Sequence, residues 1–464
     1  MSMDTKLELV QKSHAAQENT PAKKRIMTLF DEGTFVEIDS LAKSGDVQAE
    51  VVAGFGSVNG SPVYAFSQNN QVAGGAMSKA QAAKIKKIYD LAVKTGAPVV
   101  GIFDSNGGRL KEGNEMLAAY GELLLQSNNL SGVVPQISVI AGTCVGTSAM
   151  IAAGADFVIM AKEASFGVAV NGCDETAEQA SKSGAAHLLA DNAEDAVAAA
   201  RRLIAVLPSN NLEAPLMCEF AEPENGEAIL NAAAAKLDVD TDAATACDIV
   251  SAVADAGSAI EIMKGFGTGF VCELATVAGS LCGMVASDSG IVDAASCEKA
   301  ARFVRFCDAF AIPVVTLVNS TGFASLREAS MLSHAYAEAT TVKISIVTGA
   351  AYGSAFIAMA GRAANADLTV AWPNAVISAL EPKAAVAILC EDKLAAMSDP
   401  KTQRNEIVRE YTDTAASPFT AAEAGFIEDV IAPASTRACI INALDMLAGK
   451  RVSRLPKKHS NIQL

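Results

Sequence analysis

Apolar and polar positions along the chain follow the pattern of short buried strands that alternate with helices. The clearest example is Val133–Met160, which reads VVPQISVIAGTCVGTSAMIAAGADFVIM. Its run Gln136–Ile140 has the length and the β-branched content of a buried strand. Glycine punctuates residues 141–147, and the small residues 148–155 predict a helix. The pattern therefore predicts a strand that turns sharply into a helix.

Such a turn has chemical potential, because the N–H groups at a helix start lack partners and attract negative charge. A glycine such as Gly142 or Gly146 lets a ligand approach the backbone closely. Cys144 is the only ionisable residue in the turn, so catalysis here would use backbone amides, as in an oxyanion hole. An ordinary α/β connection fits the same pattern. A membrane span fits it less well, because of Pro135, Gln136 and the missing basic flank.

The same pattern occurs a second time. Residues 342–373 read VKISIVTGAAYGSAFIAMAGRAANADLTVAWP. At an offset of 207 positions, Gly146 matches Gly353 and Thr147 matches Ser354. Three further blocks recur in the same order, at offsets of 219, 218 and 215: residues 58–60 with 277–279, 83–90 with 301–308, and 98–100 with 313–315. Ordered recurrence of this kind indicates an internal duplication.

The duplication predicts two domains, residues 1–240 and 241–464, joined through the acidic, proline-containing segment 212–245. A hairpin is expected at Asn59-Gly60. Besides the helix at 148–155, helices are expected at four further places in the first copy: within residues 1–40, and over residues 78–95, 110–128 and 192–207.

Composition narrows the possible functions. The 464 residues are 51% hydrophobic and 19% charged, so each copy can bury a substantial core. The net charge of −16 argues against nucleic acid or an anionic membrane as the main partner. Ten scattered cysteines without a C-x-x-C pair, and an N-terminus without an apolar signal region, favour reduced thiols and a cytoplasmic protein. The four histidines lie far apart, so their spacing predicts no metal site.

Two other places could bind a substrate. Gly107, Gly108 and Arg109 follow the predicted strand 98–103, and ligands of α/β sheets bind at the carboxyl ends of strands. Lys79 is the first of several lysines on the predicted helix 78–95. Those lysines form either a solvated face or an edge that binds phosphate.

Six segments resemble the carboxyltransferase subunits of biotin-dependent acyl-CoA carboxylases and decarboxylases, of the propionyl-CoA carboxylase β and methylmalonyl-CoA decarboxylase α type. The segments are Ala22–Asp39, Lys94–Gly113, Gly132–Met160, Glu298–Val318, Tyr352–Pro373 and Ser417–Arg437. The resemblance implies an α/β fold of two tandem crotonase-like (ClpP/crotonase) domains, each a β-β-α superhelix. It assigns the first domain to acyl-CoA and the second to biotin.

The resemblance also implies an activity: a carboxyl group moves between carboxybiotin on a partner protein and the α-carbon of a short-chain acyl-CoA, of the propionyl/methylmalonyl or acetyl/malonyl type. The sequence has neither a Met-Lys-Met biotinylation site nor an ATP-grasp region, so biotin is expected on another chain. The expected partners are a biotin carboxyl carrier protein with a biotin carboxylase or a membrane decarboxylase subunit. A homo-oligomer, from dimer to hexamer, is expected as well.

Site residues follow from the same resemblance. The thioester oxygen is expected at Gly146 and Thr147, and the biotin carbonyl at Gly353, Ser354 and Ala355. The remaining expected contacts are Lys79, Gly107, Gly108, Arg109 and Gly142 for CoA, and Gly322, Phe323, Tyr352 and Ile357 on the biotin side.

The sequence departs from the family at several of these positions. The family usually has Gly-Gly at both turns, whereas this chain has Gly146-Thr147 and Gly353-Ser354. If the second amide needed a positive φ, Thr147 would be strained. The family's Asp-x-Pro-Gly-Phe loop reads Asn-Ser-Thr-Gly-Phe at residues 319–323. Ile357 stands where propionyl-preferring members carry an acid, so the acyl group stays open.

Two alternative functions remain. A biotin-independent acyl-CoA hydrolase, isomerase or decarboxylase of the crotonase type would need an acidic or basic side chain near the first turn, and Glu112 and Asp104 are the candidates. A non-catalytic paralogue that scaffolds a carboxylase complex would explain the altered glycine pairs.

Overall fold

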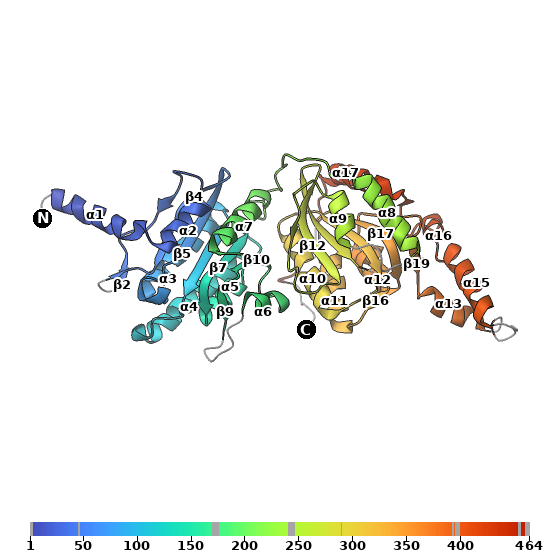
Figure 1. Cartoon of the computed structure of the whole chain (residues 1–464), viewed down its shortest axis with the longest axis horizontal. Coiled ribbons are helices and arrows are strands. Elements are labelled where there is room, and N and C mark those ends of the chain that lie inside the picture. Colours follow the sequence, from blue (N-terminus) through green and yellow to red (C-terminus); the bar gives the residue numbers. More distant parts are fainter. Residues whose placement is uncertain are drawn as a thin grey trace. The chain divides into compact units, whose positions relative to one another are not determined.

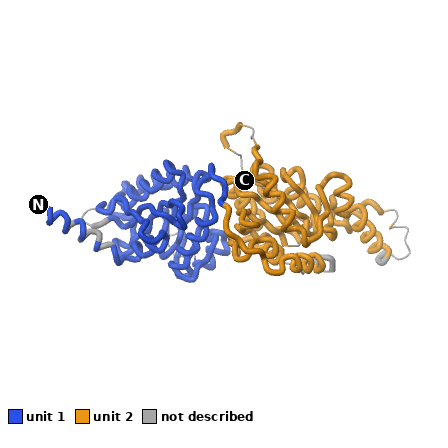
Figure 2. The backbone as a smooth tube through the Cα atoms, turned by 90° about the horizontal axis from the view of Figure 1, so that it is seen from above, with its two compact units in different colours: residues 1–216 blue, residues 217–464 orange. Residues whose placement is uncertain are grey.

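The computed structural model describes residues 3–44, 47–168, 176–239, 246–288, 290–391, 394, 400–452 and 456–459. The chain divides into two compact units, residues 1–216 and 217–464 (Figure 2). The sequence placed residues 217–240 in the first domain. The structure places residues 217–239 in the second unit, because Leu230 and Ala233 of α8 (Gly226–Val239) pack into the core of that unit. The predicted connection 212–245 thus contains a helix of the second unit.

Unit 1 is an α/β/α layered structure around one sheet, with strand order β1-β4-β5-β6-β7-β8-β10 (Figure 1). The strands are β1 (Val36–Glu37), β4 (Val51–Val58), β5 (Ser61–Gln68), β6 (Val99–Ser105), β7 (Gln136–Val145), β8 (Phe157–Ala161) and β10 (Leu188–Ala190). β1, β4 and β5 pair antiparallel, and the pairs from β5 to β10 are parallel. A short strand, β9 (Ser165–Gly167), pairs with the far end of β7.

The helices of unit 1 cover the two faces of this sheet. α3 (Lys79–Thr95) and α4 (Asn114–Leu130) pack against each other and share the main apolar cluster with the sheet. α2 (Pro21–Leu29) and α7 (Ala193–Val206) pack against each other and against the sheet. The remaining elements are α1 (Met3–Glu18), β2 (Lys43–Ser44), β3 (Val47–Gln48), the 3₁₀ turns at 73–75 and 110–112, α5 (Thr147–Ala153) and α6 (Ala177–Lys182).

Unit 2 repeats the topology strand for strand, in the order β11-β12-β13-β15-β17-β18-β20 with β19 beside β17. The strands are β11 (Ile260–Glu261), β12 (Phe270–Val277), β13 (Ser280–Ser287), β15 (Val314–Ser320), β17 (Lys343–Tyr352), β18 (Leu368–Ala371), β19 (Val376–Ser378) and β20 (Asp429–Val430). A separate ribbon pairs β14 (Ile291–Val292) with β16 (Gly322–Phe323). The helices include α9 (Ala246–Val253), α10 (Ala294–Ala309), α11 (Leu326–Glu338), α12 (Ser354–Met359), α13 (Pro382–Leu389), α15 (Pro400–Asp413), α16 (Pro418–Glu423) and α17 (Thr436–Leu447).

Polar contacts repeat as well, which confirms the predicted duplication and the hairpin at Asn59-Gly60. In unit 1 the amides of residues 59 and 60 donate to the carboxylate of Asp31, at 3.1 and 2.9 Å. In unit 2 the amides of residues 278 and 279 donate to Asp255, at 2.9 and 2.8 Å. Each turn residue has a positive φ, which Asn59, Gly60 and Gly279 tolerate well and which is unfavourable for Ala278.

One predicted correspondence is wrong by three residues. The N-caps of α3 and α10 are Ser78 and Asp293, an offset of 215 rather than 218. Lys84 and Lys299 confirm this register, since each ammonium donates to the carbonyl of the first residue of β4 or β12, at 3.1 and 2.9 Å. A shift of three residues keeps side chains on nearly the same helix face, so apolar periodicity alone could not reveal the error.

The structure also corrects the predicted bounds of the strand and the helix within residues 133–160. β7 continues to Val145, through most of the predicted turn, because residues 143–145 pair with β9. α5 starts at Thr147 rather than Ser148. Over the part of the chain that the structure describes, no helix is long and apolar enough to cross a membrane.

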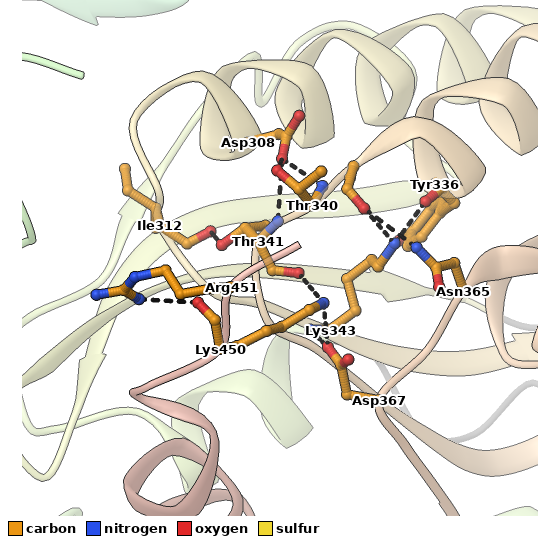
Figure 3. A network of polar contacts seen from close by, with 11 residues as sticks. Asp308, Ile312, Tyr336, Thr340, Thr341, Lys343, Asn365, Asp367, Lys450 and Arg451 are labelled. Carbon is orange, nitrogen blue, oxygen red and sulfur yellow. Dashed lines mark hydrogen bonds and ion pairs between the residues drawn. The ribbon is translucent and has the colours of Figure 1, made fainter. Parts of the chain in front are cut away.

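In unit 2 a polar network ties the C-terminal segment to the sheet (Figure 3). Lys450 donates to the carbonyl of Thr341 at 2.8 Å and pairs with Asp367 at 2.7 Å. Asp367 also accepts the backbone amide of Lys343 at 2.8 Å. The buried ammonium of Lys343 donates to two carbonyls at the end of α11, at 2.7 and 2.6 Å. A cation suits that helix end, where the dipole is negative.

A second feature of unit 2 places a carboxyl group in the core. Glu273 of β12 is 4% exposed and faces Glu261 across the β11–β12 pair. Among the described residues, its Oε2 atom has no hydrogen-bond partner. Unit 1 has Gly54 at the matching position opposite β1. Burial, and then the neighbouring Glu261 carboxylate, raise the pKa of Glu273 to about 7, against the opposing effect of Lys264 and Lys299.

This carboxyl group predicts pH-dependent stability. Because its pKa is higher in the folded state, the native protein binds the proton more tightly, and stability falls as pH rises from about 4.5 through about 7. We expect Glu273→Gln to stabilise unit 2 at pH 8 by on the order of 1–3 kcal/mol and to flatten its pH profile. Thermal unfolding between pH 5 and 8 measures this. Glu224→Gln, the same substitution at an exposed carboxylate of unit 2, is the control. Equal pH slopes in Glu273→Gln and wild type would contradict the expectation.

Candidate active site

The first turn depends on one glycine. Gly146 follows β7 with φ 66° and ψ −137°, a conformation that favours glycine, and α5 begins at the next residue. The residue with positive φ is thus Gly146. Thr147 takes the first helical position, so the strain considered for a threonine at a positive φ does not arise.

A strand edge holds this turn in place. The Gly146 amide donates to the carbonyl of Gly167 in β9 at 2.9 Å, and the helix then closes on itself with the Ala149 amide bonded to the Gly146 carbonyl at 3.1 Å. As at any helix start, the amides of Thr147 and Ser148 have no acceptor within the helix. Gly146 and Thr147 are partly exposed, whereas Ser148 is buried, with its hydroxyl 3.0 Å from that of Tyr120. The turn therefore lies at the surface of unit 1 and not in its core.

The second turn has the same construction. Gly353 follows β17 with φ 45° and ψ −112°, and its amide donates to the carbonyl of Ser378 in β19 at 2.8 Å. A Cβ atom at Gly353 would lie 2.8 Å from the carbonyl oxygen of Ala379. The second turn is thus more crowded than the first, where a Cβ on Gly146 would meet no atom within 4 Å.

The predicted biotin-side residues lie around the second turn. Ser354 is exposed, the Ala355 side chain is buried, and Ile357 is 53% exposed one helical turn further on. Tyr352 is half-buried, and burial raises the pKa of its hydroxyl. Gly322 and Phe323 form β16, which follows the end of β15, and Ser320 of β15 pairs with β17 one residue before Tyr352. All of these residues belong to one region of unit 2.

Each strand bulges just before its turn. In β7 residues 141–143 stand opposite Asp104 alone, and in β17 residues 348–350 stand opposite Asn319 alone. A Cβ on Gly142 would lie 2.3 Å from Asp104 Oδ1, and one on Gly349 would lie 2.4 Å from Asn319 Oδ1. Gly142, a predicted CoA contact, therefore makes room for the Asp104 carboxylate.

The predicted CoA loop lies beside the first turn, close to the end of β7. Its backbone pairs with Met77, whose amide donates to the carbonyl of Gly107 at 2.8 Å and whose carbonyl accepts the amide of Arg109 at 2.9 Å. A Cβ on Gly107 would contact Val145 at 4.0 Å, and one on Gly108 would overlap the side chain of Met116. The loop thus lies between Met77, just before α3, Met116 near the start of α4, and the end of β7.

The charged residues near this loop have internal partners. Arg109 forms an ion pair with the fully buried Glu50 and lies 3.9 Å from Glu112. Glu112 also accepts the Lys79 amide at 2.7 Å, and the exposed Lys79 ammonium lies 3.3 Å from Glu115. Asp104, the second candidate for a side-chain acid or base, is paired with Arg25 at 2.8 Å. Glu112 and Asp104 therefore both hold structural contacts.

Sequence reasoning missed several contributors. The carbonyls of Gly167 and Ser378 orient the two turns, yet their strands, Ser165–Gly167 and Val376–Ser378, share no residue pattern. Every residue has a backbone carbonyl that can accept a hydrogen bond, whatever its side chain. The residue types of these two strands therefore did not indicate their role. Arg25 and Glu50 were missed for another reason: their partners lie 79 and 59 positions away along the chain.

Comparisons with known proteins agree with this geometry. The family model described as carboxyl transferase domain matches residues 13–462. The chain is 38% identical to the methylmalonyl-CoA decarboxylase subunit alpha of Veillonella parvula, covering 98% of this chain and 95% of that protein. It is 36% identical to the propionyl-CoA carboxylase beta chain of Saccharopolyspora erythraea, covering 98% and 92%.

A solved structure extends the likeness to three dimensions. Transcarboxylase 12S, described as a hexamer with methylmalonyl-coenzyme A and methylmalonic acid bound, superposes with a TM-score of 0.91 at 33% identity. The match covers 100% of this chain and 99% of that one. It confirms the expected crotonase-like fold. With a family match over nearly its whole length, the chain belongs to the carboxyl transferase family and is an acyl-CoA carboxyltransferase.

Proposed function

We propose that the chain transfers a carboxyl group between biotin carried on a separate protein and the α-carbon of a short-chain acyl-CoA, with methylmalonyl-CoA and propionyl-CoA as the first pair to test. The observation that carries the proposal is the duplicated glycine turn, with an edge strand bonded to each glycine amide. Family membership supports it, because the relatives named above act on these thioesters.

The first turn would bind the acyl thioester. Loss of a proton or of CO₂ from the α-carbon places negative charge on the thioester oxygen, and preorganised amides stabilise such charge. The Thr147 amide, which has no acceptor within the helix, would donate such a hydrogen bond. Gly146, whose own amide is bonded to the Gly167 carbonyl, would let the oxygen approach the backbone. No side-chain acid or base is required near the turn, which agrees with the structural roles of Glu112 and Asp104.

The second turn would receive biotin. When bound, biotin supplies a ring nitrogen that accepts or releases the carboxyl group. The amides of Ser354 and Ala355 would hold its carbonyl oxygen, since the Gly353 amide is bonded to the Ser378 carbonyl. The absence of a side chain at Gly353 leaves the backbone open to a ring. Ile357 is apolar and 53% exposed, so it would present an apolar surface to the reacting groups.

The remaining assignments follow from the same proposal. A biotin carboxyl carrier protein, with a biotin carboxylase or a membrane decarboxylase subunit, would be the partner. A homo-oligomer, from dimer to hexamer, is proposed because transcarboxylase 12S is described as a hexamer. The cytoplasm is the proposed location, because the buried thiols of Cys144, Cys272 and Cys282 suit a reducing compartment.

Biotin dependence is the direct test. We expect the purified chain to convert methylmalonyl-CoA to propionyl-CoA and CO₂ only when biotin or a biotinyl protein is added, with release of propionyl-CoA as the measurement. Equal turnover without biotin would favour a biotin-independent enzyme of the crotonase type. Absence of turnover, together with a melting temperature that acyl-CoA does not raise, would favour a scaffold.

Substitutions at the two glycines test the turns separately. Gly146→Ala forces alanine into a left-handed conformation, and we expect a loss of roughly 10²-fold in kcat together with weaker stabilisation by acyl-CoA. Gly353→Ala adds the contact with Ala379, so we expect a similar loss in kcat and a higher KM for biotin.

Gly121→Ala is the matched control for both variants. Gly121 occupies an exposed position of α4, where an added Cβ would meet no atom within 4 Å and alanine favours the helix. Its kcat should equal that of wild type. Unchanged kcat in both turn variants, with wild type active, would show that the turns do not bind the reacting oxygens.

A further inference from the structure

The duplicated fold allows α2 and α9 to be aligned residue by residue. Arg201 donates to the carbonyl of Leu29, the last residue of α2, and Arg437 donates to that of Val253, the last residue of α9. Two residues further on, an aspartate holds each hairpin turn. Counting back four positions from each helix end places Arg25 of unit 1 where unit 2 has Ile249.

The residues opposite the two bulges, Asp104 and Asn319, differ in one side-chain atom. Asp104 and Asn319 occupy equivalent positions, each 4% exposed, and each side chain packs against the bulged strand. In unit 2 the neutral Asn319 accepts the Ala350 amide at 2.9 Å. In unit 1 the Asp104 carboxylate pairs with Arg25 at 2.8 Å, and Arg25 also reaches the carbonyl of Ala141 at 3.5 Å.

The two differences therefore occur together. Unit 1 combines a carboxylate in the bulge with a guanidinium on the helix, and unit 2 combines a carboxamide with the apolar, 4% exposed Ile249. A buried carboxylate without a counter-charge is costly, and so is a buried guanidinium. In each unit the two side chains together carry no net charge. Unit 2 therefore shows which double substitution in unit 1 would keep this balance: Arg25→Ile with Asp104→Asn.

We propose that Arg25 and Asp104 form a positioning pair for the first turn. This inference rests on the proposed function of that turn. The Asp104 carboxylate fills the bulge over Gly142, and Arg25 ties the carboxylate to the Ala141 carbonyl. The pair thereby fixes the last part of β7, which leads to Gly146. Neither side chain has to contact the substrate.

Charge balance is the second part of the role. The first turn would hold an oxygen on which negative charge develops, and an unpaired carboxylate buried in the preceding bulge would oppose that charge, because the interior screens it weakly. Arg25 removes this opposition while the carboxylate keeps its place in the bulge. In unit 2 a carboxamide fills the equivalent bulge without charge, so no cation is needed there.

Three variants test the pair: Arg25→Ile, Asp104→Asn and the double variant. Each single variant leaves one charge of the pair without its partner: the buried Asp104 carboxylate or the partly buried Arg25 guanidinium. We expect kcat to fall by at least about tenfold, with KM for biotin within about twofold of wild type. The double variant reproduces the combination found in unit 2, and we expect its kcat to recover to within about threefold of wild type. A double variant no better than the worse single variant, or single variants with wild-type kcat, would overturn the inference.

Arg201→Ile is the matched control, because Arg201 pairs with Asp31 at the same distance of 2.8 Å in the same unit. We expect it to lower the melting temperature but to leave kcat unchanged. An equal loss of kcat in Arg201→Ile would show that the Arg25–Asp104 pair affects activity only through the stability of unit 1, and would overturn the inference. The reciprocal variant Asn319→Asp places an unpaired carboxylate in the second bulge, and we expect a loss of kcat there as well.

The outcome can be separated from that of the proposed function. An active wild type with no change in any pair variant would remove the positioning role alone. An inactive wild type would remove the proposed function. In that case, the melting temperatures of the three variants would still test the pair. If the two charges balance each other, the double variant must have a higher melting temperature than either single variant.

Discussion

Each half of this protein depends on one hydrogen bond from a glycine amide to a short edge strand. Gly146 bonds to β9 at 2.9 Å and Gly353 bonds to β19 at 2.8 Å. The short strands β9 and β19 extend the sheet along β7 and β17 beyond the ends of β8 and β18. The chain turns into a helix directly after this extension. Because both glycines have positive φ, the turn can be this sharp without strain. The chemistry assigned to each unit follows from this arrangement of backbone.

The two halves share a framework and differ in charge. Three polar contacts recur in both units. An aspartate, Asp31 or Asp255, holds the hairpin turn. An arginine binds the last carbonyl of α2 or α9, and a lysine binds the first carbonyl of β4 or β12. Individual positions have diverged: Arg25 against Ile249, Asp104 against Asn319, and Gly54 against Glu273. The framework maintains the strand order, and the divergent positions give each unit its own electrostatics.

Much of the architecture could be predicted from the sequence, because strand runs, glycine turns and an ordered internal repeat depend on local patterns. The register of α3 against α10 could not be, since a slip of three residues preserves the helix face. Residues 217–239 were placed with the wrong half, because their composition resembles a linker while Leu230 and Ala233 are buried in the second core. At the first turn Gly146 was identified. The carbonyl of Gly167 and the guanidinium of Arg25 were not, since both act across long separations in sequence.

The network around Lys450 has a consequence for biosynthesis. Unit 1 has all of its own residues once position 216 has left the ribosome, so its sheet can form while translation continues. Unit 2 differs, because the start of β17 is linked through Asp367 and Thr341 to Lys450, which lies 109 positions after Thr341. The nascent second unit therefore lacks this closing contact until Lys450 has left the ribosome, and the two homologous halves complete their folding at different times.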